Sequence, residues 1–125
     1  ERRANLLRAD LDMFTQGQII SVGWDPKKKD NTAYMARLEP VEDEVWDIRS
    51  RDPSPAIRVL GSFSEPDVFI ALVWSIRKFL QHRASSHWAN FIRAHKVEWR
   101  KLFPTYPPHT GTCLHDYIRE QAFLV

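Results

Sequence analysis

The sequence EVWDIRSRDPSPAIRVLGSFSEPDVFIALVW, at residues 44–74, predicts three strands joined by two tight turns. β-Branched and aromatic residues fill three runs, and the clusters Asp-Pro-Ser-Pro and Ser-Glu-Pro-Asp separate them. Arg49, Arg51 and Arg58 lie inside the strands rather than only at their ends. A charged strand residue has to point away from the core, so we expect this sheet to present a cationic face to an anionic group.

Alternation along the first two strands divides their side chains between the faces of the sheet. The first strand places Trp46 and Ile48 on one face and the following residues on the other: Val45, Asp47, Arg49 and Arg51. The second strand sets Ile57, Val59 and Phe63 against Arg58, Leu60 and Ser62. Whether Arg49 and Arg58 share a face depends on the register of the hairpin, which a loop with two prolines leaves open.

The third run, residues 68–74, has two interpretations. The preceding Ser-Glu-Pro-Asp also matches the start of a helix, with a capping residue and a proline in the first turn. We favour a strand, because β-branched and aromatic residues dominate the run and a helix there would be apolar on every side. From Ser75 the pattern becomes helical, with Ile76, Phe79 and Leu80 expected to pack inward.

Elements on both sides complete the expected fold. Apolar spacing predicts a helix over residues 2–15, and alternation predicts a strand over 20–24. Residues 32–38 fit either one helical turn or a short strand. A helix capped by Ser86 is expected to run to about Phe103 and end before Pro104, with His95 at the edge of its apolar stripe. Thr112 is suited to cap a last short helix over residues 113–121.

We therefore predict a single α+β domain spanning residues 1–125. It would consist of an antiparallel sheet of about four strands, with an N-terminal helix and C-terminal helices packed on one face. Its 125 residues are 43% hydrophobic and include five tryptophans, which is enough to build a core. No apolar run is long enough to cross a bilayer, so neither a membrane segment nor a membrane partner is expected. The single cysteine, Cys113, fits a reducing compartment, and a cytoplasmic location is expected.

The net charge and the motifs of the sequence limit the kinds of binding and catalysis that can be expected of this chain. A net charge of +2 is too small to indicate nucleic-acid binding by itself. His109, Cys113, His115 and Asp116 match no compact zinc motif, and the sequence has no Gly-rich phosphate loop or nucleophile elbow. No metal and no cofactor are expected.

Residues 35–80 resemble the central β-meander of the RelE/HigB-like toxin superfamily. In that family the first strand reads approximately apolar-Trp-Glu-apolar-Arg, the second carries an arginine before an apolar pair, and basic residues follow the third. The matching positions here are residues 46–49, Arg58 before Val59 and Leu60, and the pair Arg77 and Lys78. The chain departs from the family pattern where it adds a long Trp-rich helix and a proline-rich segment after the third strand.

The resemblance implies a small bacterial or phage protein that cuts messenger RNA at the ribosome without a metal, and that an acidic antitoxin protein binds. Arg58 would be the catalytic residue that stabilises the charged phosphorane, because a guanidinium can donate two hydrogen bonds to phosphate oxygens. The residues that would bind the RNA backbone are Arg49, Arg51, Arg77, Lys78 and Arg83. The candidates for the acid and base are His82, Tyr106 and His109, which carry exchangeable protons.

Other interpretations of the same residues remain open. The arginines also fit a structural role in which they pair with Asp47, Asp52 and Glu65 on a solvated sheet face. A non-catalytic accessory or interaction domain would use the basic face to bind an acidic protein. A gyrase-directed toxin of the same superfamily is a third interpretation, because the fold alone does not fix the target.

Overall fold

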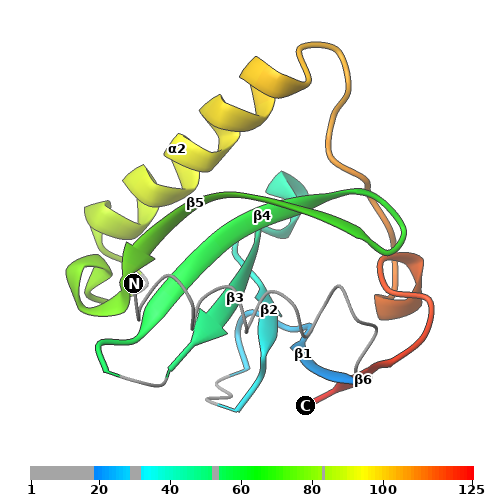
Figure 1. Cartoon of the computed structure of the whole chain (residues 1–125), viewed down its shortest axis with the longest axis horizontal. Helices are drawn as coiled ribbons and strands as arrows, with labels where there is room; N and C mark the ends of the chain where they lie inside the picture. The colour runs from blue at the N-terminus through cyan, green and yellow to red at the C-terminus, as the bar shows by residue number, and fades with distance from the viewer. Residues whose placement is uncertain (1–18, 29–31, 52–53, 83) are drawn as a thin grey trace, which may run out of the picture.

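A computed structural model of the chain describes residues 19–28, 32–51, 54–82 and 84–125. These residues form an α+β fold with a six-stranded mixed sheet and one long helix, α2 (Figure 1). The strands are β1 (Ile20–Gly23), β2 (Met35–Arg37), β3 (Trp46–Ser50), β4 (Ile57–Glu65), β5 (Val68–Ile76) and β6 (Ala122–Leu124). Within the described ranges, no helix has both the length and the apolar content needed to cross a membrane. The helix expected over residues 2–15 lies outside the described residues.

The centre of the sheet is the predicted antiparallel meander. Strands β2, β3, β4 and β5 pair in chain order, and the strand interpretation of residues 68–74 is confirmed, because β5 begins at Val68 and runs to Ile76. The expectation of about four antiparallel strands was wrong. Strand β1 pairs in parallel with both β2 and β6, which gives the order β5-β4-β3-β2-β1-β6. Strands β2 and β6 have only three residues each, too few to show an alternating pattern in the sequence.

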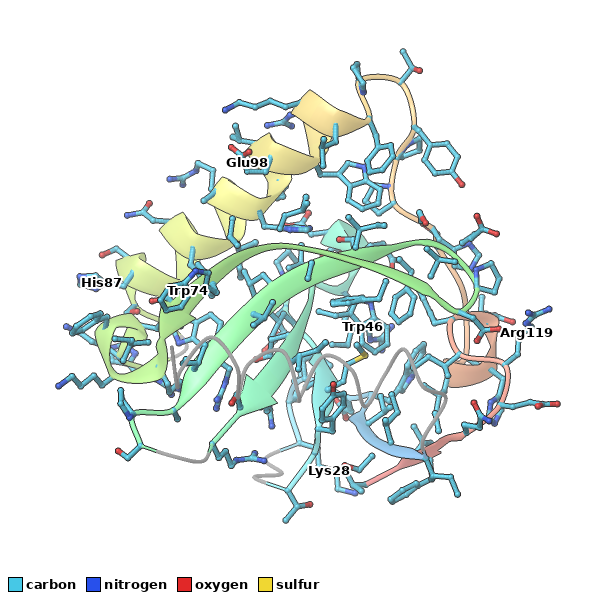
Figure 2. All side chains as sticks on the ribbon, in the orientation of Figure 1. Lys28, Trp46, Trp74, His87, Glu98 and Arg119 are labelled. Carbon is cyan, nitrogen blue, oxygen red and sulfur yellow. The ribbon has the colours of Figure 1, made fainter. Side chains whose placement is uncertain are left out.

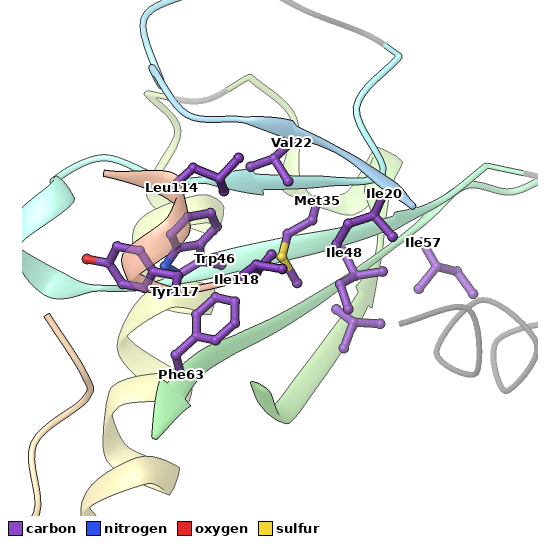
Figure 3. Close-up of a cluster of buried hydrophobic side chains, with 11 residues drawn as sticks. Ile20, Val22, Met35, Trp46, Ile48, Ile57, Phe63, Leu114, Tyr117 and Ile118 are labelled. Atoms are coloured by element: carbon purple, nitrogen blue, oxygen red, sulfur yellow. The ribbon is translucent and has the colours of Figure 1, made fainter. Parts of the chain in front are cut away.

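One face of the sheet carries an aromatic core. Trp46 is fully buried, and its ring centroid lies 5.3 Å from that of Phe63 and 5.0 Å from that of Tyr117 (Figure 3). Ile48 and Val59 belong to the same cluster, so the predicted division of the strands into faces is confirmed. Tyr117 comes from the chain that follows η3 (Leu114–Asp116), the short 3-10 turn found where a helix over residues 113–121 was expected.

Helix α2 (Ser86–Leu102) covers the opposite face. Trp88 and Phe91 pack there against Leu60 of β4. The N-cap is Ser85 rather than Ser86, because the Ser85 hydroxyl accepts a hydrogen bond from the Trp88 backbone N–H at 3.2 Å. The C-terminal elements therefore do not share one face as expected, since α2 lies on one side of the sheet and η3 on the other.

The segment after β5 corrects a further expectation. Residues Arg77–Leu80 form a 3-10 turn, η2, of four residues. Leu80 is buried as predicted, but Phe79 is 58% exposed. In a four-residue turn Phe79 and Leu80 point in different directions, so both cannot pack against the same core.

Candidate phosphate-binding site on the sheet

The register of β3 and β4 places Arg49 directly opposite Arg58. Directly paired residues of an antiparallel ladder point to the same face, so the two guanidinium groups lie side by side. Leu60, also on that face, belongs to the cluster under α2. The sequence had left this register open.

The carboxylate of Asp47 lies between the two arginines. Its two oxygens are each 3.4 Å from a guanidinium Nε, Oδ1 from that of Arg49 and Oδ2 from that of Arg58. The Asp47 side chain is 0% exposed, and those of Arg49 and Arg58 are 7% and 12% exposed. The predicted pairing of the arginines with Asp47 is therefore present, but it is buried rather than solvated, and removing one of its charges would leave the others uncompensated.

The environment of Arg58 changes its proton affinity. Burial lowers the pKa of Arg58 to about 10, Asp47 opposes that shift, and the positive charges of Arg49, Arg77 and Arg51 add to it. Arg58 remains charged at neutral pH. Its Nη1 is buried and has no hydrogen-bond partner among the described residues.

Arg51 and Arg77 extend the cluster toward solvent. Arg51 is exposed, and its Nη1 donates a hydrogen bond to the Ala33 carbonyl at 3.3 Å. Arg77 is tied to the start of β4, since its backbone N–H donates to the Ala56 carbonyl at 2.7 Å. Its guanidinium donates to the Gln81 carbonyl at 2.6 Å and lies 5.6 Å from the centre of the Trp88 ring. We call Arg49, Arg51, Arg58 and Arg77 the arginine cluster.

The remaining basic candidates are Lys78 and Arg83. Lys78 is exposed, with its Nζ 5.7 Å from the centre of the Phe79 ring. Arg83 lies outside the described residues. His82 is exposed and follows η2, the turn that begins at Arg77.

Tyr106 and His109 are not brought to the arginine cluster. The Tyr106 hydroxyl donates to the Ser64 carbonyl at 2.5 Å, and the His109 backbone N–H donates to the Phe63 carbonyl at 2.7 Å. Ser64 lies six residues from Arg58 on β4, which is about 20 Å along a strand. In this structure neither side chain is placed to exchange a proton at Arg58.

Sequence reasoning missed a buried polar contact between the sheet and α2. The Ser62 hydroxyl donates to the Glu44 carbonyl at 2.7 Å and lies 2.8 Å from Nε2 of His95. His95 is 1% exposed, and burial lowers the pKa of its imidazole to about 4. It was expected at the edge of the helix stripe, but it follows Phe91 and precedes Trp99 at intervals of four, which is the spacing of the buried side.

Glu44 contributes its side chain to a second buried contact. The Tyr117 hydroxyl donates to Glu44 Oε1 at 2.6 Å. Burial and this hydrogen bond raise the pKa of Tyr117 to about 12, so Tyr117 is a neutral hydrogen-bond donor rather than an acid at neutral pH. Burial also raises the pKa of Glu44.

No group of three or more His, Cys, Asp or Glu side chains suited to a metal ion occurs within the described ranges. Comparison with known proteins adds no family: no family model, curated protein or solved structure matches the chain. The resemblance to RelE/HigB-like toxins consequently depends on residues 35–80 alone.

The Asp47→Asn substitution tests the buried charge arrangement. It keeps the side-chain shape but leaves two buried guanidinium groups without their carboxylate, so we expect unfolding to become easier by about 3–5 kcal/mol. The control is Asp43→Asn, because Asp43 pairs with Lys96 where the side chains are 24% and 39% exposed, and such pairs contribute about 1 kcal/mol or less. Urea denaturation measures both variants, and equal effects would contradict the buried role of Asp47.

Acidification tests the burial of His95. Its folded pKa of about 4 lies below the ordinary histidine value of 6.5, so the unfolded chain takes up the proton first and stability falls as the pH falls below 6.5. Between pH 7 and pH 5 we expect a loss of about 2 kcal/mol in the free energy of unfolding. Urea denaturation at the two pH values measures it. The His95→Gln variant should not show this loss of stability between pH 7 and pH 5. If the variant shows the same loss, titratable groups other than His95 cause it.

Proposed function

We propose that this chain is a RelE/HigB-like toxin, an endoribonuclease that acts on messenger RNA through the arginine cluster. The observation that carries the proposal is the direct pairing of Arg49 with Arg58, beside Arg51 and Arg77, at one end of the β3-β4-β5 meander. Arginine is the side chain best suited to bind phosphate oxygens with paired hydrogen bonds.

The chemistry assigned to the site is metal-independent cleavage, as the resemblance implies. The 2′-hydroxyl of the RNA attacks the adjacent phosphorus after losing its proton to a base, and the bond to the 5′-oxygen breaks as an acid protonates that oxygen. Between these events the phosphorane carries additional negative charge. Arg58 stabilises that charge through the part of its guanidinium side chain that remains accessible, since the side chain is 12% exposed.

The more exposed basic side chains bind the RNA backbone. Arg51 and Lys78 are exposed, and Arg77 is half-buried at the start of η2. Of the acid and base candidates, His82 is the one we assign, because η2 connects it to the end of β4 that carries Arg58.

The second candidate function is a non-catalytic interaction domain, and Asp47 favours it. A carboxylate that neutralises part of the charge on Arg49 and Arg58 is what a structural ion-pair network requires. In that function the exposed Arg51 and Lys78 would bind an acidic protein surface.

Induced expression of the chain in bacteria separates the two functions. We expect the unchanged protein to arrest growth, and the Arg58→Ala variant to restore growth because the phosphorane loses its stabilising cation. Arg93→Ala is the matched control, since Arg93 lies exposed on α2 and donates to Asn90 at 2.7 Å, so it should still arrest growth.

Thermal melting of the purified variants has to accompany this experiment. It distinguishes a variant that has lost toxicity while remaining folded from one that is no longer toxic because it is unfolded. Growth restored by a folded Arg58→Ala protein supports the nuclease. Unhindered growth at high soluble expression of the unchanged chain would exclude the toxin and leave the interaction domain.

A further inference from the structure

Strand β5 lies at one edge of the sheet, and among the described residues it pairs only with β4. Its outer side therefore presents backbone N–H and C=O groups that no described strand takes up. None of its nine residues is buried, whereas six of the nine residues of β4 are buried. The strand at the opposite edge, β6, has only three residues. The long exposed edge of this sheet is thus β5.

The composition of β5 leaves this edge open to pairing. Edge strands are usually protected by a charged residue, a proline or a short length. Residues 68–76 contain neither a charged residue nor a proline. Apolar surface also lies along the strand, since Val68 is 39% exposed and Trp74 is 54% exposed. Such an edge can add a further strand through main-chain hydrogen bonds.

A bulge at the centre of β5 determines which of its side chains share a face. The register with β4 pairs Ala71 with Gly61. It then shifts by one residue at Leu72, so that Trp74 is paired with Val59. Gly61 and Val59 are two positions apart on β4 and belong to the same face. Ala71 and Trp74 therefore share that face as well, and both are exposed.

The two ends of β5 carry opposite charges. The acidic residues Glu65 and Asp67 precede the strand, and Arg77 and Lys78 follow it. Arg119 pairs with Asp67 at 2.6 Å, and Glu65 leaves the first end with a net negative charge. A second β5 in the antiparallel direction would place its acidic end beside the basic end of the first, whereas a parallel one would bring like charges together.

We propose that β5 pairs antiparallel with β5 of a second copy of this chain, which joins the two sheets into one. Directly opposite residues must share a face, and this condition is met when Trp74 lies opposite Ala71 of the second copy. The exposed indole then covers the smallest side chain of the strand. The same register brings Lys78, four residues after Trp74, to Asp67 of the second copy, four residues before Ala71.

The edge is therefore complementary to itself in both charge and shape, as a two-fold interface requires. This property favours a second copy over an unrelated strand. The inference does not depend on the proposed function.

Sedimentation velocity of the full chain over a range of concentrations tests the proposal. The unchanged chain should form dimers as its concentration rises, and Trp74→Lys should weaken the dimer roughly tenfold, because a charge in an edge strand opposes pairing. The control is Phe123→Lys on β6, the opposite edge, where Phe123 is 49% exposed. Both side chains are exposed, so both variants should fold, and the control should form dimers as the unchanged chain does. A monomer at every concentration, or equal weakening by both substitutions, would overturn the proposal.

Reversal of the end charges tests the antiparallel direction. Glu65→Lys makes both ends of β5 positive, and Lys78→Glu cancels the charge of Arg77, so each variant alone should form dimers severalfold more weakly at low ionic strength. In an equimolar mixture the basic end of the Glu65→Lys chain again meets an acidic end. Mixed dimers should therefore be tighter than those of either variant alone. A mixture that associates no more strongly than the better of the two variants would contradict the antiparallel arrangement.

Discussion

Two guanidinium groups lie side by side on this sheet because one buried carboxylate compensates them. Like charges directly opposite on neighbouring strands destabilise a sheet, and burial increases the cost. Asp47 offsets that cost for Arg49 and Arg58 and holds both at fixed positions. One carboxylate cannot neutralise two cations, so the pair keeps a net positive charge, to which Arg51 and Arg77 add. The phosphate-binding role proposed for the arginine cluster depends on this excess.

The two faces of the sheet have different roles, because successive side chains along each strand point to opposite faces. Trp46 and Ile48 turn to the aromatic core, while Asp47 and Arg49 turn to the face that α2 partly covers. In Figure 2, the side chain of Trp46 lies in the interior of the molecule, whereas that of His87, at the start of α2, lies at its periphery. The helix that the RelE/HigB resemblance does not include therefore completes the face that carries the arginines. It also supplies His95, whose Nε2 lies 2.8 Å from the Ser62 hydroxyl of β4.

The sequence was sufficient for the local features and insufficient for the pairings between distant residues. Alternation assigned Trp46 and Arg58 to their faces, because that assignment depends only on neighbours in the chain. The register of Arg49 against Arg58 depends on the geometry of the turn, which composition does not specify. The pairing of β6 with β1 joins residues about a hundred positions apart, and such short strands leave no pattern. The hydrogen bond between His95 and Ser62 could not be predicted for the same reason. The sequence places an imidazole on the apolar side of a helix, but it does not show which distant residue that imidazole contacts.

The most direct test of the arginine cluster is a titration of the ¹⁵N-labelled chain with a short single-stranded RNA, observed at the arginine Nε–H resonances. If the cluster binds phosphate, the Arg58 and Arg51 resonances should shift together, and raising the salt concentration should reverse the shifts because phosphate contacts are salt-dependent. The resonance of Arg93 on α2 should stay in place. Shifts confined to Arg93 and other residues outside the cluster, or none at all, would contradict the central claim that paired arginines on β3 and β4 form the site.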